Sequence, residues 1–150
     1  MTTAVTRPLT VTARIADADG SAPAPAVYTA TVYMNTHDDN FDGYEPHHPL
    51  AAATRRDSSP LRLVFHASSR IRDHEDAADA AYEVGNRQGA DDNGQTWPDN
   101  IRSVSVGDVI KITGPDASTV HLSVDSYGFS PVPEPTTLVA LTDPRVTHRD

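Results

Sequence analysis

Stretches that alternate apolar and polar residues with a period of two recur along the chain, and they constrain its fold more than any other feature. Such alternation is typical of a β-strand that buries one face. It is clearest over residues 9–15, 28–34, 61–65 and 120–124, and a short apolar run at 109–112 indicates a further strand. Residues 9–15 and 28–34 could form a hairpin with a loose loop, and 109–112 and 120–124 could form a second one. We expect a mainly antiparallel sheet of about five strands.

One segment has helical periodicity instead. Asp73 is the predicted N-cap, acids follow in the first turns, where the helix dipole favours them, and the segment ends near Arg87 and Gly89. The residues that recur at helical spacing are Ile71, His74, Ala78, Ala81, Tyr82 and Gly85. The prediction is a small α+β fold in which one principal helix, from about Asp73 to Arg87, packs on the sheet.

The length of the chain, 150 residues, is that of one ordinary domain, and the chain contains no cysteine. Disulfides, thiolate zinc sites and cysteine nucleophiles are therefore excluded, and a cytoplasmic location is expected. No stretch approaches the ~20 apolar residues that a membrane helix needs, so no membrane partner is expected. We predict one domain over residues 1–133, including an N-terminal hairpin extension, and a Pro-rich, partly disordered tail over residues 134–150.

Two segments show neither periodicity. Residues 35–60 combine acids, histidines and prolines and are interpreted as a long surface loop, a class that is often functional or mobile. A second loop begins at Asp91 and Asp92, whose acids beside Asn-Gly are typical of turns, and it carries the only tryptophan, Trp97. After Phe129 a series of prolines should deny the chain regular structure, although residues 138–141 could dock as a small edge strand.

The chain is strongly acidic, since 21 acids against 12 bases give a formal charge of −9. The acids gather in residues 38–45 and 73–83. A surface of that sign repels phosphate backbones, because non-specific affinity for nucleic acids comes mostly from lysine and arginine. Direct nucleic-acid binding is therefore disfavoured, and a protein is the expected partner; the oligomeric state stays open.

Two partial metal motifs occur in the loop 35–60. The first half of an EF-hand calcium loop is matched by Asp38, Asn40, Asp42 and Gly43. Pro49 stands where the closing bidentate acid should be. Nitrogen and oxygen ligands for zinc could come from His37, His47, His48 and Asp38, but adjacent histidines in a Pro-rich loop are more often exposed and unliganded. We predict no metal site and no cofactor.

Candidate catalytic residues are also unspecific. Ser126, His121 and His66 do not belong to a motif that places a base beside a nucleophile, so no catalytic residue is assigned and an enzyme is disfavoured. Polar and aromatic residues near expected structural joints are the remaining candidates for binding: Asp108, Arg102, Asn86, Trp97 and Tyr127. Asp108 follows Gly107 in a turn, where an aspartate commonly caps backbone N–H groups, so a structural role is favoured for it.

Two segments in the C-terminal half resemble the YodL-like domain family. They are Arg102-Ser103-Val104-Ser105-Val106-Gly107-Asp108-Val109-Ile110 and Ser123-Val124-Asp125-Ser126-Tyr127-Gly128-Phe129. The helix end Tyr82-Glu83-Val84-Gly85-Asn86 is also similar, and the resemblance covers about residues 61–133. The chain departs from the family pattern at Gly85, often phenylalanine there, and at Val104, usually leucine, which implies a different packing beneath the helix. The resemblance implies no reaction and no catalytic residue.

What the resemblance does imply is a setting. Similar domains occur on phages, plasmids and integrated mobile genetic elements, sometimes in proteins thought to counter host defences. The leading hypothesis is therefore a non-catalytic accessory protein that binds another protein, with a host-defence component as a candidate. A nucleic-acid-associated module and an enzyme with a site on its loops are the alternatives that stay open.

Overall fold

The computed structural model describes residues 26–37 and 42–141. Within them the chain forms one helix and six strands, which confirms the predicted α+β class. All strand pairs in the sheet are antiparallel. The elements are β1 (Val27–Asn35), β2 (Leu50–Ala52), β3 (Leu63–His66), α1 (His74–Gly85), β4 (Val109–Thr113), β5 (Thr119–Val124) and β6 (Phe129–Val132).

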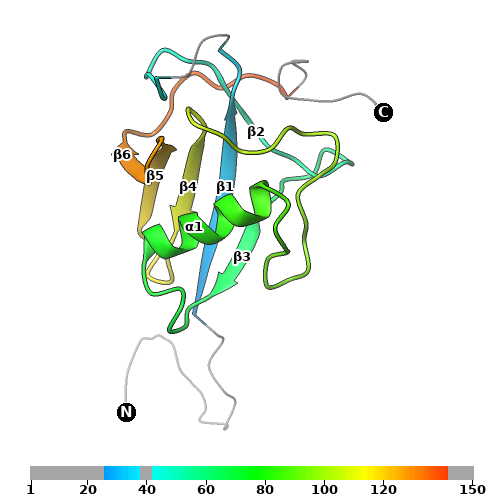
Figure 1. Ribbon diagram of the computed structural model, residues 1–150, viewed down its shortest axis with the longest axis vertical. Helices are drawn as coiled ribbons and strands as arrows, with labels where there is room; N and C mark the ends of the chain where they lie inside the picture. Colours follow the sequence, from blue (N-terminus) through cyan, green and yellow to red (C-terminus); the bar gives the residue numbers. More distant parts are fainter. Residues whose placement is uncertain (1–25, 38–41, 142–150) are drawn as a thin grey trace, which may run out of the picture.

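The first described strand, β1, lies in the interior of the sheet (Figure 1). It pairs with β4 along one edge, and along the other with β3 at residues 27–30 and with β2 at residues 33–35. β4, β5 and β6 continue the sheet in that order. Residues 9–15 lie outside the described part of the chain, and so does the hairpin expected between them and residues 28–34.

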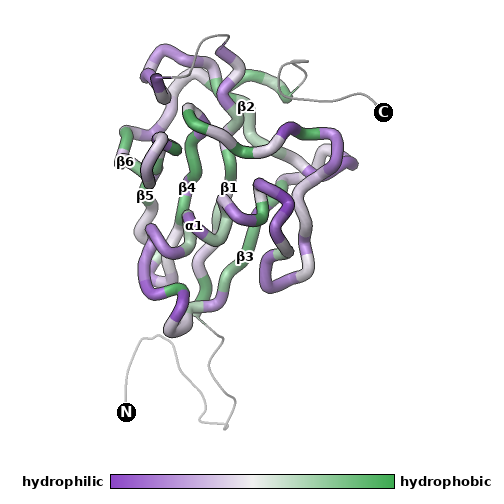
Figure 2. Tube along the Cα trace, in the orientation of Figure 1, coloured by the Kyte–Doolittle hydropathy of each residue, from purple (hydrophilic) through white to green (hydrophobic). Residues whose placement is uncertain are grey.

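The core lies between α1 and the face of the sheet that it crosses (Figure 1). Alternate residues of β1 are buried there, namely Tyr28, Ala30, Val32 and Met34. The helix contributes mostly small buried residues, which let it approach the sheet closely: Ala77, Ala78, Ala81, Val84 and Gly85. Leu122 and Val124 are buried and Val120 packs against them, so the inward face predicted for residues 120–124 is confirmed. Figure 2 shows hydrophobic residues along the strands and hydrophilic ones in the surrounding loops.

The helix begins where the sequence predicts and ends slightly earlier. Asp73 is its N-cap, because the side chain accepts a hydrogen bond from the N–H of Asp76 at 2.8 Å. Its last helical residue is Gly85, and Asn86 caps the C-terminus. Arg87, at the predicted end, already has a left-handed backbone with φ of 63°. A non-glycine residue in that region is uncommon, and here it turns the chain out of the helix.

Two strands lie where the sequence analysis expects irregular chain. The loop assigned to residues 35–60 contains β2, and the expectation that prolines prevent regular structure after Phe129 is wrong for β6. β6 accommodates Pro131 because it is the last strand of the sheet, where a missing N–H donor need not interrupt a further ladder. Three-residue β2 is too short to show any periodicity, so the sequence carries no pattern for it.

The segment after β6 returns to the opposite edge of the sheet. The N–H of Leu50 donates to Thr137 O at 2.9 Å, and the N–H of Val139 donates to Leu50 O at 2.8 Å. Leu138 thus forms a single parallel bridge with Leu50. This bridge stands where the sequence suggests a small edge strand over residues 138–141. Among the described residues no helix is long and apolar enough to span a membrane.

Candidate functional site

Asp108 and Arg102, two of the predicted binding residues, form a buried ion pair. The Arg102 guanidinium donates to both carboxylate oxygens, at 2.7 and 2.8 Å, and the backbone N–H groups of Asn35 and Ser105 donate at 2.8 and 2.9 Å. Burial raises the pKa of the Asp108 carboxyl, whereas the guanidinium and the two amides lower it. All four partners are donors, so the site binds the ionised carboxylate. Asp108 is fully buried, and its hydrogen bonds hold the turn against β1, which favours the structural role expected for it.

The same turn joins the β4–β5 hairpin. The N–H of Gly107 donates to Val124 O at 3.0 Å, and the N–H of Val124 donates to Asp108 O at 2.8 Å. These bonds place the turn beside Val124, the last residue of β5, and so next to the turn that follows it. Phe129 lies over the helix, with its ring centroid 6.4 Å from that of Tyr82 on α1. Tyr127, another of the binding candidates, takes no part in this packing and is 96% exposed in the turn between β5 and β6.

Asn86 and Trp97 also stabilise the fold. The Asn86 amide donates to Tyr82 O at 2.9 Å, which satisfies a carbonyl at the helix end. Trp97 is buried and donates from its indole N–H to Arg102 O at 2.9 Å. Arg87, which the sequence analysis places only at the helix end, holds the same loop by donating to Pro98 O and Ile101 O. Of the five binding candidates, Tyr127 is the one that the structure leaves exposed.

Gly85, at the end of the helix, packs directly against Val104. A Cβ atom on Gly85 would lie 2.3 Å from Val104 Cγ2, and the N–H of Val104 donates to Gly85 O at 3.1 Å. Val104 therefore occupies the space that a side chain at position 85 would need.

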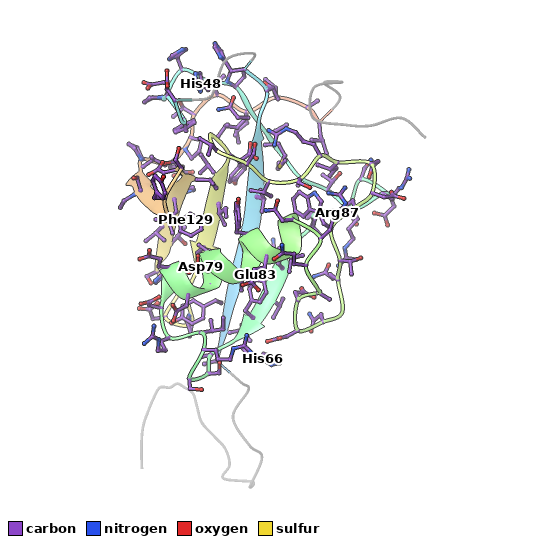
Figure 3. The ribbon with its side chains drawn as sticks, viewed as in Figure 1. His48, His66, Asp79, Glu83, Arg87 and Phe129 are labelled. Carbon is purple, nitrogen blue, oxygen red and sulfur yellow. The ribbon has the colours of Figure 1, made fainter. Side chains whose placement is uncertain are left out.

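His37, His47 and His48, here called the imidazole cluster, gather at one end of the sheet. The pairing of β1 with β2 extends to Thr36, whose N–H donates to Pro49 O at 3.0 Å, and this places His37 opposite His48. One ring nitrogen from each residue lies within 4.8 Å of the other two. His48 is buried, at 3% exposure, so the expectation of exposed histidines is wrong for it. Figure 3 shows His48 at the end of the molecule opposite His66.

The geometry of the imidazole cluster does not suit a metal ion. The rings of His37 and His48 are stacked, with centroids 4.2 Å apart and planes 22° apart, so their in-plane lone pairs run nearly parallel and do not converge. The N–H of Glu45 donates to His48 Nδ1 at 3.1 Å, and Asn35 Nδ2 lies 3.0 Å from the same atom. A metal-bound histidine usually donates from its second nitrogen, whereas this one accepts.

The orientation of the Asn35 amide supports this assignment. Its Nδ2 donates to Gly107 O at 2.9 Å, and its Oδ1 accepts from the N–H of His37 at 2.8 Å. The amide therefore cannot flip to accept from His48 without losing both bonds. Asp38 and Asn40 of the calcium-like stretch lie outside the described residues. The imidazole cluster is best explained as packing that closes the end of the sheet.

A groove between α1 and β3 is the feature that the sequence analysis misses. It has a volume of about 410 Å³, within the usual range of ligand sites. Its apolar lining comes from Phe65, Ile71, Ala80 and Val84, and its polar lining includes Asp76, Asp79, Glu83, His66 and Asp92. Figure 3 shows Asp79 and Glu83 on the side of α1 that faces the viewer, above His66. The sequence signal for this site is the spacing of two acids beside two inward apolar residues on one helix.

The carboxylates of the groove differ in their partners. Asp76 pairs with Arg72 at 2.9 Å, and Asp92 accepts from the N–H of His66 at 2.6 Å. The carboxylates of Asp79 and Glu83, in contrast, make no hydrogen bond or ion pair with any residue that the structure describes. The pKa of the Asp79 carboxyl is raised, first by burial and then by the neighbouring carboxylates of α1. The groove thus holds negative charge that the described residues leave unneutralised.

The outer edge of β3 forms the far wall of the groove and is closed by two aspartates. The N–H of Val64 donates to Asp91 Oδ2 at 2.9 Å, and the N–H of Asp92 donates to Val64 O at 3.0 Å. Together with the bond from His66, these contacts occupy the N–H groups of Val64 and His66 and the carbonyl of Val64, which could otherwise pair with another strand. Asp91 forms the expected turn as well, since it accepts from the N–H groups of Asn93 and Gln95.

Comparisons with protein-family models, with curated proteins and with solved structures find no match to this chain. The resemblance to the YodL-like family stays a prediction that rests on the residues quoted for it.

Proposed function

We propose that this chain is a non-catalytic accessory protein that acts by binding another protein through the groove between α1 and β3. The observation that carries the proposal is the pair of carboxylates, Asp79 and Glu83, set beside an apolar lining without a partner in the described residues. Like charges four residues apart destabilise a helix, and Glu83 lies in the last turn, where the helix dipole also disfavours an acid. Side chains that weaken the fold and serve no internal contact are typical of functional surfaces.

The setting that we propose is a phage, plasmid or integrated mobile element, and the partner class is a host-defence component. Support for both comes from the resemblance of residues 102–110 and 123–129 to the YodL-like family. The exposed aromatic ring of Tyr127 adds a second feature common at protein interfaces, although it lies on a different element from the groove.

The two alternatives are less well supported. Binding of nucleic acid would have to overcome the formal charge of −9 and the acidic rim of the groove. An enzyme could use His66, Ser68 and Asp92, which line the groove and are the residue types of a hydrolytic triad. However, Ser68 Oγ accepts from the N–H groups of Arg70 and Ile71, which favours a turn-forming role for this hydroxyl.

The test is affinity capture with a variant that blocks the groove. Ala80→Arg introduces a long, charged side chain on the groove lining, and Ala140→Arg makes the same change at an exposed position outside it. We expect purified wild-type protein and Ala140→Arg to retain a partner protein from a nuclease-treated host lysate, and Ala80→Arg to lose it. Equal capture by all three would contradict the proposal, and retention of nucleic acid in an untreated lysate would favour the alternative.

A further inference from the structure

We infer that the groove between α1 and β3 recognises an extended segment of the partner in which an arginine or lysine stands beside an aliphatic residue. This inference rests on the proposed function and adds the chemistry of the partner. The groove offers two features that such a segment satisfies together. Its apolar lining can cover an aliphatic side chain, and the carboxylates of Asp79 and Glu83 can pair with a cation.

The shape of a basic side chain suits this arrangement. Arginine and lysine bury their methylene stems against apolar surface while the charged group remains at a polar rim. Along α1, each acid directly precedes an apolar residue, as Asp79-Ala80 and one turn later as Glu83-Val84. An apolar strip and an acidic strip therefore run side by side on the groove wall. A segment that lies along the helix would place its methylene groups on the first strip and its cation on the second.

Charge complementarity selects a cationic occupant over a neutral or acidic one. The four carboxylates that line the groove face Arg70 and His66 as the basic lining residues. Asp76 and Asp92 are already engaged by Arg72 and by the N–H of His66, which leaves Asp79 and Glu83 as the available acceptors. Burial raises the pKa of the Asp79 carboxyl most, and repulsion from neighbouring carboxylates, Glu83 among them, adds to it. A cation placed between Asp79 and Glu83 would offset part of that repulsion.

The contacts should be made through side chains and not by adding a strand to the sheet. At the β3 edge the N–H groups of Val64 and His66 already donate to Asp91 and Asp92. A peptide that paired with this edge would have to displace both carboxylates. The partner segment is therefore expected to lie over the groove in an extended form without backbone pairing to β3.

The experiment is an NMR titration of the whole chain with three short peptides of one length. The first carries an arginine between two leucines, the second replaces the arginine by glutamine, and the third replaces it by glutamate. We expect saturable shifts at Asp79, Ala80 and Glu83 with the arginine peptide, at least fivefold weaker binding of the glutamine peptide and none of the glutamate peptide. Equal affinities for the first two, or shifts confined to other elements, would overturn the inference.

Protein variants provide the matching controls. Asp79→Asn with Glu83→Gln should weaken binding of the arginine peptide about five- to tenfold and reduce its dependence on salt. Glu45→Gln, an exposed acid at the imidazole cluster, should change the affinity less than twofold. If spermine shifts the same residues with the affinity of the arginine peptide, charge alone is recognised and the peptide is not the ligand.

The outcomes also separate this inference from the proposed function. Capture that is lost in Ala80→Arg but kept in the Asp79→Asn, Glu83→Gln variant would leave protein binding through the groove intact and refute the cationic segment. Capture that Ala80→Arg does not affect would refute binding through the groove itself. Circular dichroism of each variant establishes that it is folded before binding is compared.

Discussion

Replacing Asp108 by asparagine tests whether the ion pair with Arg102 organises the domain. The substitution keeps the size of the side chain and removes its charge. Each carboxylate oxygen accepts two hydrogen bonds, one from Arg102 and one from a backbone N–H. An asparagine in either orientation must therefore turn its NH₂ group toward two donors. The guanidinium of Arg102, whose side chain is only 20% exposed, also loses its counter-charge.

The expected loss of stability follows from these contacts. Removing one member of a buried, hydrogen-bonded ion pair costs about 3–5 kcal/mol, because the remaining charge stays desolvated. The loss of a single hydrogen bond between neutral groups would lower the free energy of unfolding by only about 1 kcal/mol. We therefore expect Asp108→Asn to lower the free energy of unfolding by at least about 3 kcal/mol, measured by urea denaturation followed by circular dichroism.

The control is Asp99→Asn, the same chemical change in an exposed ion pair with Arg56. That aspartate side chain is 74% exposed, so its loss should cost no more than about 0.5 kcal/mol. A loss below about 1 kcal/mol for Asp108→Asn would refute the structural role of the pair. If that variant unfolded normally and failed to capture the partner, Asp108 would belong to the binding site instead.

Four further predictions concern the core, the helix end, the groove and the imidazole cluster. Leu122→Ala should lower the free energy of unfolding by about 2–5 kcal/mol, and a midpoint within error of wild type would contradict the inward face of β5. Gly85→Ala should cost about 1–3 kcal/mol by the same assay, because its Cβ would collide with Val104, and Val104→Ala should restore part of the loss. Asp79→Asn should stabilise the protein at pH 7 by about 0.2–0.5 kcal/mol, since the raised pKa means that ionisation is less favourable in the folded state. The destabilisation of the wild-type protein by the ionised Asp79 is absent below the unfolded pKa of about 3.9 and is complete once the pH has risen through the folded pKa. The stabilisation by Asp79→Asn should therefore vanish in acid. Calorimetric titration with zinc and calcium should show no saturable binding at micromolar affinity, and such binding would mean that the stacked rings reorient around an ion.

The sequence predicts the elements whose pattern is long enough to be periodic. β5 and α1 are examples, since apolar alternation indicates the strand and an N-cap aspartate marks the start of the helix. The sequence also predicts that Asp108 lies in a turn and caps backbone N–H groups there, as it does for Ser105. The ion pair between Asp108 and Arg102 could not be predicted, because the chain between the two residues is irregular and no sequence pattern indicates that it brings them together.

The groove could not be predicted for a different reason. Its walls come from α1 and from the edge of β3, and the sequence does not reveal that the helix lies beside β3 when it packs on the face of the sheet. The helical pattern predicts that the acids of α1 face outward, and Asp79 and Glu83 do so in part. What distinguishes these two carboxylates is that they have no hydrogen-bond or ion-pair partner among the described residues. That property depends on where every neighbouring cation lies in space, which the sequence does not show. Conversely, the sequence identifies Asp91 as a turn residue, while its bond to Val64 depends on a contact between distant segments.

The interior position of β1 has a consequence for synthesis of the protein on the ribosome. Ala30 pairs with Ile112, so one edge of this strand has no partner until β4 has left the exit tunnel. During that interval the apolar side chains of Val32 and Met34 also lack most of the core that buries them. Nascent chains with an open strand edge and uncovered apolar residues are prone to aggregate and are typical clients of chaperones. Translation that stalls between β3 and β4 should therefore yield insoluble fragments and not a smaller folded domain.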